Sequence, residues 1–217
     1  GGEVPIGNPA LSSLTGLEGV TSIGGGLKVK YNNALTSLTG LDGLTSIGGS
    51  LIIGDYYGGN NPTLTTLTGL EGVTTIGGGI CISFNDALTS LAGLEGVSAI
   101  GGDLEIQNND ALTSLTGLED IAPGSIESIT IRFNSNLSLC NVESVCNYLA
   151  DPNGAIEIHN NATGCNNINE VAELCGYPLP YNLHLTSQSQ IDSFQINYPG
   201  ITEIWMNIWI NGEDITN

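Results

Sequence analysis

Hydrophobic residues recur along this chain in a pattern that repeats about every 24 residues. A leucine opens each repeat, and successive opening leucines are 24, 29, 24, 24 and 25 residues apart: Leu11, Leu35, Leu64, Leu88, Leu112 and Leu137. Further apolar residues keep their places relative to this leucine, and in the second repeat they are Leu38, Leu41, Leu44 and Ile47. No single repeat can bury its own apolar face, so this periodicity indicates stacked turns that share one continuous core.

A short segment of alternating apolar and other residues follows in each repeat. The segments are Leu27–Val29, Leu51–Ile53, Ile80–Ile82, Leu104–Ile106, Ile129–Ile131 and Ile156–Ile158. Alternation of this kind places the first and third residues inward and the middle residue outward. We therefore predict a mainly β fold, a right-handed parallel β-solenoid with turns of about 24 residues.

Two corners of each predicted turn can be recognised from the residues that recur there. A Gly-Gly pair such as Gly48-Gly49 precedes each strand and suits a corner that needs positive φ or close backbone approach. An asparagine follows each strand and suits a ladder of stacked amides. The asparagines expected in this ladder are Asn32, Asn60, Asn85, Asn108 and Asn134.

Two outward columns of polar residues also recur. One column carries carboxylates, at Glu18, Asp42, Glu71, Glu95 and Glu119. Stacked carboxylates repel unless a cation such as Ca²⁺ bridges them or they fan out into solvent, and both interpretations stay open. The other column carries hydroxyls, at Ser12-Ser13, Thr36-Ser37, Thr65-Thr66, Thr89-Ser90 and Thr113-Ser114. It suggests either an ice-binding face or ordinary polar residues on an exposed strand.

The charge balance excludes some partners. Three basic residues stand against 22 acidic ones, which gives a net charge of −19. Binding to nucleic-acid phosphates or to anionic membrane surfaces needs clustered cations, so neither is expected. The sequence contains no apolar run long enough to insert into a membrane. Cationic, neutral or metal-bridged partners are favoured.

The 29-residue step contains the one insertion in the pattern, which includes Tyr56 and Tyr57. Insertions in repeat proteins form loops that often lie on the binding face, and tyrosine gives a large contact area at low entropic cost. The alternative is a tolerated surface loop, because long loops have a small entropic cost. Together with outward strand positions, this loop gives a candidate ligand-binding set of Lys28, Lys30, Tyr56, Tyr57, Glu105 and Arg132.

The regular pattern ends near Arg132, and the segment that follows carries a resemblance. The Leu-Cys-Asn-Val-Glu-Ser motif at 139–144, a helix, one more strand and Gly164-Cys165 resemble the closing segment of a receptor L domain, the ligand-binding β-solenoid of the epidermal growth factor and insulin receptors. The repeated Leu-Thr-Ser-Leu-Thr-Gly-Leu and Ile-Gly-Gly-x-Leu-x-Ile motifs resemble bacterial members of that leucine-rich-repeat-like family, found in Bacteroidetes-type surface and secreted proteins. The resemblance implies an extracellular ligand-binding domain over about residues 2–177.

Four of the five cysteines cluster in a predicted C-terminal cap at 138–177. Such clustering favours two disulfides and an oxidising location, with a zinc site as the rival interpretation. The resemblance pairs the cysteine before the helix with the one after the last strand, which implies Cys140–Cys165 and leaves Cys146–Cys175. Cys146 lies in an expected helix at 142–149, and Cys175 directly follows a second expected helix at 167–174. Cys81 is expected to point outward, either free or paired between molecules.

Two domains are predicted. Residues 1–177 form the solenoid and its cap, and its first strand, with Val4 and Ile6, has no strand before it. Residues 178–217 restart the register with a strand, a helix at 189–198 and a further strand, as in the cap and first turn of a truncated second module. Trp205 and Trp209 are expected to point outward as interface candidates.

No motif in the chain indicates catalysis. The carboxylates form columns rather than isolated pairs, and His159 and His184 have no triad-like context. We therefore expect no enzymatic activity, with a β-helix lyase or hydrolase as a weaker alternative. The predicted function is a non-catalytic recognition or adhesion module of a larger surface or secreted protein, with a glycan or protein ligand and no required cofactor. The main alternative is a structural unit that associates head to tail into a fibre or sheath.

Overall fold

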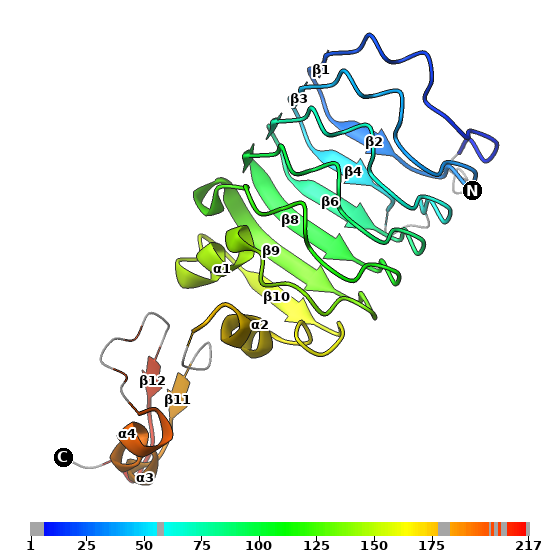
Figure 1. Ribbon diagram of the computed structural model, residues 1–217. Helices are drawn as coiled ribbons and strands as arrows, with labels where there is room; N and C mark the ends of the chain where they lie inside the picture. The colour runs from blue at the N-terminus through cyan, green and yellow to red at the C-terminus, as the bar shows by residue number, and fades with distance from the viewer. Residues whose placement is uncertain are drawn as a thin grey trace, which may run out of the picture.

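A computed structural model describes residues 7–55, 59–177, 183–199, 201, 204 and 208–215. The described chain is mainly β, with two parallel sheets side by side in its repeats, a two-stranded sheet after the cap, and α-helices confined to its C-terminal part (Figure 1). The smaller sheet contains β1 (Ser22–Ile23), β3 (Ser46–Ile47), β5 (Thr75–Ile76) and β7 (Ala99–Ile100). The larger sheet contains β2 (Leu27–Val29), β4 (Leu51–Ile53), β6 (Ile80–Ser83), β8 (Gly102–Gln107), β9 (Ile126–Arg132) and β10 (Ile156–His159).

Strand order follows the repeats. The larger sheet has the order β10-β9-β8-β6-β4-β2 and the smaller has the order β1-β3-β5-β7, so each strand pairs with its equivalents in neighbouring repeats. The register aligns equivalent residues, and Leu51 lies opposite Leu27 on one side and Ile80 on the other. A short 3-10 helix at Pro123–Ser125 precedes β9. The predicted mainly β class and parallel strand pairing are therefore confirmed.

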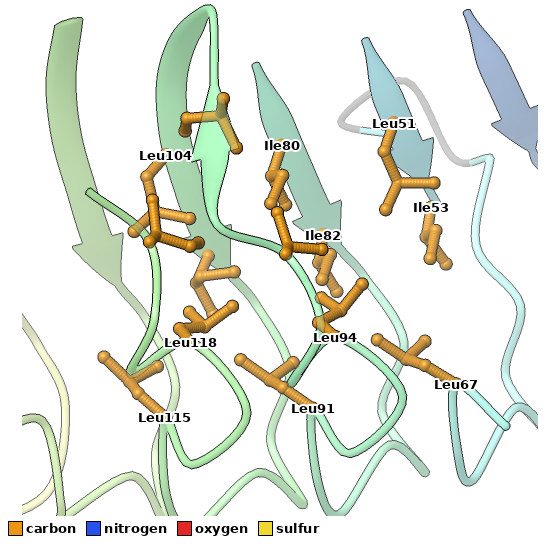
Figure 2. Packing of buried hydrophobic residues seen from close by; sticks show 14 of the residues in the cluster. Leu51, Ile53, Leu67, Ile80, Ile82, Leu91, Leu94, Leu104, Leu115 and Leu118 are labelled. Carbon is orange, nitrogen blue, oxygen red and sulfur yellow. The ribbon is translucent and has the colours of Figure 1, made fainter. Parts of the chain in front are cut away.

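The apolar columns of the repeats form one core. Leu67, Leu91 and Leu115 lie across from the inward residues of the larger sheet and are completely buried (Figure 2). Leu17 is an exception, because it was expected in the same column as Leu41 but is 43% exposed. It belongs to the first repeat, on whose outer side no described repeat packs. An apolar column of this kind buries a side chain only where a neighbour covers it.

The amide ladder forms, but at a different register from the one expected. Its members are Asn32, Asn61, Asn85, Asn109, Asn134 and Asn161, so the assignments of Asn60 and Asn108 were wrong. Each side-chain amide donates to the side-chain oxygen of the next member, at 3.0–3.3 Å. The Nδ2 of each member after Asn32 also donates to a strand carbonyl of the preceding repeat, as Asn109 does to Ile82 at 2.9 Å.

The Gly-Gly corners after the first repeat serve close approach to the preceding repeat and do not have positive φ. A Cβ on Gly77 would lie 2.3 Å from the carbonyl oxygen of Gly48 in the preceding repeat, so no larger residue fits without a backbone shift. Within the repeats, positive φ recurs instead at the glycine of the Thr-Gly-Leu or Ala-Gly-Leu turns, where Gly40 has a φ of 112° and Gly93 a φ of 111°. Each of these repeats therefore needs glycine at two places, at one because the backbones approach closely and at the other because φ is positive.

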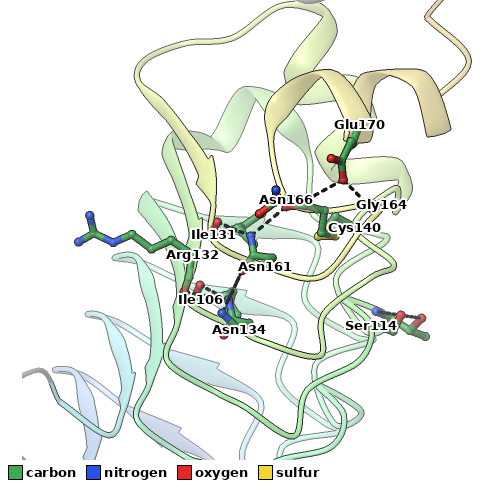
Figure 3. The surroundings of a disulfide bond; sticks show 12 residues. Ile106, Ser114, Ile131, Arg132, Asn134, Cys140, Asn161, Gly164, Asn166 and Glu170 are labelled. Atoms are coloured by element: carbon green, nitrogen blue, oxygen red, sulfur yellow. Dashed lines mark hydrogen bonds between the residues drawn. A yellow bond between two sulfur atoms is a disulfide. The ribbon is translucent and has the colours of Figure 1, made fainter.

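The cap follows β9 and contains α1 (Glu143–Ala150), β10 and α2 (Ile168–Leu174). Disulfides join Cys140 to Cys165 and Cys146 to Cys175, with Cα separations of 5.7 and 5.5 Å, as the resemblance implied. Helix α2 is capped by Asn167, whose side chain accepts from the backbone of Asn169 and Glu170. Figure 3 shows the Cys140 disulfide beside the last members of the amide ladder.

The described residues after 182 form a small separate core. Strand β11 (Leu183–Leu185) pairs in parallel with β12 (Ile208–Ile210), and Leu183 and Leu185 are buried. The single helix expected at 189–198 is instead two short helices, α3 (Gln188–Asp192) and α4 (Phe194–Asn197), because Ser193 leaves the helical conformation between them. Trp209 is exposed as expected and stacks on His184, whereas Trp205 lies outside the described residues.

Candidate ligand-binding surface on the larger sheet

The outer face of the larger sheet collects the basic residues of the chain. Strand alternation turns the middle residue of each strand outward, and the register aligns these residues across the sheet. The resulting column is Lys28, Ile52, Cys81, Glu105, Thr130 and Glu157. A second outward column contains Arg132 and His159, and Lys30 continues β2 at the same edge.

The structure therefore brings four of the predicted binding residues to one sheet but not into one contact. Lys28 in β2 and Glu105 in β8 are separated by two strands, which corresponds to about 14 Å at strand spacing. Tyr56 and Tyr57 lie outside the described residues. The predicted residues therefore spread over one face of the sheet and do not line a single pocket.

Two of the three cations on this face are neutralised locally. Lys30 Nζ lies 2.6 Å from a carboxylate oxygen of Asp55. Arg132 Nη1 donates to Glu157 at 3.1 Å, and Arg132 Nε donates to the Gln107 side-chain oxygen at 3.1 Å. Figure 3 shows the Arg132 side chain pointing away from the amide ladder and the disulfide. The guanidinium is held in a fixed orientation on the outer side of β9.

A row of residues with left-handed backbone runs along one edge of this face. Each lies directly before a member of the amide ladder, and the φ angles are between 55° and 61° at Tyr31, Phe84, Asn108, Phe133 and Asn160. Asparagine enters this region readily, whereas an aromatic residue there is unusual and costs about 1–2 kcal/mol. Three of these five corners nevertheless carry an aromatic ring.

A shallow hollow lies at this edge, between the corners that precede Asn85, Asn109 and Asn134. It is lined by Phe84, Gln107, Asn108, Arg132 and Phe133, and has a volume of about 570 Å³. Phe133 is 43% exposed although it contacts His159 edge-on at 5.4 Å between ring centroids. The Arg132 Cζ lies 5.8 Å from the centre of the Phe133 ring. The hollow thus combines two aromatic rings with three planar polar groups.

Sequence reasoning selected Arg132 but missed the other four residues of the hollow. The signal was present in the segments Lys30-Tyr31-Asn32, Ser83-Phe84-Asn85 and Arg132-Phe133-Asn134. In each, an aromatic residue replaces the asparagine that precedes the ladder in other repeats, at 108 and 160. This substitution could be recognised only after the ladder register was known.

Cys81 lies half-buried in the middle of the outward column, as a free thiol within the described residues. Burial raises the pKa of this thiol to about 11, against the opposing effect of a hydrogen bond with Ser83. Glu105 lies opposite Cys81 in the strand register and raises this pKa further. A thiol in this state is protonated near neutral pH and is a poor nucleophile.

The carboxylate column closes local turns. In each repeat the carboxylate accepts a hydrogen bond from the glycine N–H two residues earlier, and for Glu95 and Gly93 the distance is 2.7 Å. The same contact occurs at Glu18, Asp42, Glu71 and Glu119, at 2.7–2.8 Å. Among the described residues, no three His, Cys, Asp or Glu side chains are grouped closely enough to hold a metal ion. These carboxylates therefore serve the fold of each turn.

The hydroxyl column also makes regular contacts within the fold. Thr65 Oγ1 donates to the carbonyl of Thr36 at 3.2 Å, and Thr89 donates to that of Thr65 at 3.4 Å. Neighbouring hydroxyls pair within a turn, as Ser37 does with Thr39 at 3.0 Å. Many hydroxyls of this column thus make hydrogen bonds that link neighbouring repeats or close a turn.

Across the described part of the chain, no helix has the length and apolar character that crossing a membrane requires. Comparisons with known protein families, with curated proteins and with solved structures find no match for this chain.

Proposed function

We propose that this chain is a non-catalytic extracellular recognition or adhesion module, built as a right-handed parallel β-solenoid of the receptor L-domain type. The observation that carries the proposal is that basic and aromatic side chains are concentrated on one face of the molecule. The outer face of the larger sheet has all three basic residues and the aromatic hollow, while the carboxylate and hydroxyl columns elsewhere are occupied with closing and linking turns.

The two disulfides support an extracellular location. Cys140–Cys165 and Cys146–Cys175 both lie in the cap, and disulfides form and persist mainly in oxidising compartments. The net charge of −19 supports solubility outside the cell and a partner other than a polyanion.

The chemistry of the outer face supports binding and not catalysis. Its thiol, Cys81, has a pKa raised to about 11, which is unsuited to a nucleophile. Its imidazole, His159, packs against Phe133, and its guanidinium is paired with Glu157. Side chains that are held in place by such contacts can orient a ligand.

The proposal is tested by measuring attachment of the fluorescently labelled chain to a glycan array and to intact cells that carry surface proteins and polysaccharides. We expect saturable binding that Arg132→Ala weakens, because the change removes the guanidinium from the face. Thr89→Ala, on the hydroxyl column, is the matched control and should bind as the unmodified chain does. Absence of saturable binding to both targets would refute a recognition function.

One observation favours a second candidate, end-to-end association into a fibre. The side-chain oxygen of Asn32, the first described member of the amide ladder, is buried without a described hydrogen-bond partner, and Leu17 beside this end is exposed. Every later ladder oxygen accepts from the preceding asparagine, so this end has the chemistry to receive another repeat. Light scattering of the chain with and without residues 178–217 tests this candidate, and a monomer in both forms would exclude it.

A further inference from the structure

We infer that the hollow at Phe84, Gln107, Asn108, Arg132 and Phe133 binds a neutral linear glycan that runs across successive repeats. This inference rests on the proposed recognition function and names the ligand class of one part of the outer face. It follows from four features of the hollow: the backbone conformation of its aromatic residues, the spacing of its rings, its polar lining, and the pairing of its charges.

The backbone conformation of these corners does not itself require an aromatic ring. Phe84 and Phe133 have φ angles of 57° and 56°, in the region where Asn108, at the same corner of the intervening repeat, has a φ of 55°. Asparagine satisfies this corner at low energy, so nothing in the corner itself demands an aromatic side chain. Strain maintained at a partly exposed residue is a feature of binding sites.

The spacing of the rings suits a chain of sugars. Phe84 follows β6 and Phe133 follows β9, with β8 as the one strand between them. Two strand spacings put the two corners about 10 Å apart. A pyranose ring presents an apolar C–H face and a polar hydroxyl edge. Alternate sugars can therefore stack on the two rings while the sugar between them meets the amide of Asn108.

The polar lining suits hydroxyl groups. The side chain of Asn108 has no hydrogen-bond partner in the described part of the chain, and it supplies both a donor and an acceptor. Gln107 also lines the hollow, is almost fully buried, and its side-chain oxygen accepts a hydrogen bond from Arg132. Aromatic rings combined with a few fixed planar polar groups provide orientation and specificity for an uncharged ligand.

The charge pairing favours a neutral glycan over an acidic one. Arg132 is bonded to Glu157 and Gln107, so its charge is compensated before a ligand arrives. The net charge of −19 repels a polyanion over the whole molecule. A protein partner needs about 800 Å² on each side of a stable interface, which the five lining residues do not provide by themselves.

The test uses the full chain and isothermal titration with cellohexaose, xylohexaose, mannohexaose and hexa-N-acetylchitohexaose as neutral probes, and hexagalacturonate as the acidic one. We expect at least one neutral probe to bind, and hexagalacturonate to bind at least about tenfold more weakly than that probe. Phe84→Asn and Phe133→Asn should each weaken binding about tenfold, the loss expected for one stacked ring. Asparagine is the residue already present at this corner at 108 and 160, so both variants should keep the fold.

Leu139→Asn is the matched control, because Leu139 is exposed but does not line the hollow. It should leave the affinity unchanged. Neutral glycan binding that survives both phenylalanine changes would overturn the assignment of the hollow. Saturable attachment to cells without binding to any neutral probe would overturn the glycan inference and leave the recognition function intact, whereas loss of both would refute the recognition function itself.

Discussion

Asn108 and Asn109 are adjacent and chemically identical, yet only Asn109 belongs to the amide ladder. Its Nδ2 lies within 2.9–3.3 Å of the carbonyls of Ile82 and Gln107 and the side chain of Asn134, and its oxygen accepts from Asn85. The sequence contains Asn-Asn pairs at several corners, so position after the strand cannot distinguish the two residues. The distinguishing feature is a fixed distance of three residues to the opening leucine, whose N–H bonds to the ladder asparagine carbonyl.

This difference gives a paired prediction. Asn109→Gly should lower the free energy of unfolding by about 2–4 kcal/mol, because several buried backbone groups lose their partners. Asn108→Gly should change it by less than about 1 kcal/mol, since glycine accepts left-handed backbone at that corner. Urea denaturation of both variants measures the two values. Equal losses would contradict the ladder register.

Cys81 provides a prediction about pH. Burial raises the pKa of its thiol to about 11 from an unfolded value of 9.0, so the folded chain holds this proton more tightly than the unfolded chain does. The resulting contribution to stability is present below about pH 9 and is lost as the pH rises toward 11. At pH 7.5 the native thiol should react with iodoacetamide about 100-fold more slowly than in the denatured chain, because of its lower thiolate fraction. Mass spectrometry of timed samples measures the rate, with Cys81→Ser as the blank; equal rates would contradict the burial.

At the scale of an element, the repeat was predictable because each apolar column obeys one rule along its whole length. The strands from Leu27–Val29 to Ile156–Ile158 and their inward residues follow directly from alternation. What could not be predicted depends on contacts between elements. Leu17 is exposed because no described repeat covers its outer side. The helix break at Ser193 depends on the φ and ψ angles of that one residue. The hollow forms because corners from different repeats lie at the same edge of the sheet.

The apolar columns give a test of the register. Leu91 is completely buried in the middle of the core, whereas Thr89 in the same repeat is exposed. Leu91→Ala should lower the free energy of unfolding by about 2–5 kcal/mol through lost burial and a cavity. Thr89→Ala should lower it by less than about 0.5 kcal/mol. Thermal and urea denaturation compare the two variants, and similar losses would show that the inward and outward faces have been exchanged.

At the scale of the whole molecule, the cap differs from the repeats because covalent bonds connect its parts. The Cys140–Cys165 and Cys146–Cys175 disulfides join α1, α2 and the segments beside them. Non-reducing peptide mapping should recover these two pairs with Cys81 unpaired. Reduction should lower the free energy of unfolding by about 2–5 kcal/mol. A Cys140–Cys146 peptide, or four free thiols that bind zinc, would contradict the assignment.

Each strand of the two larger sheets pairs only with strands of the adjacent repeats, and this arrangement has a mechanical consequence. A force that pulls the two ends of the chain apart loads the outermost strand first, and that strand can detach without disturbing the third or fourth. The region from β2 to β9 should therefore unfold one repeat at a time at low tension. The cap cannot lengthen in this way because its disulfides close loops of 25 and 29 residues. Under tension the repeats would then extend gradually from the N-terminal side while the disulfide-linked cap stays closed.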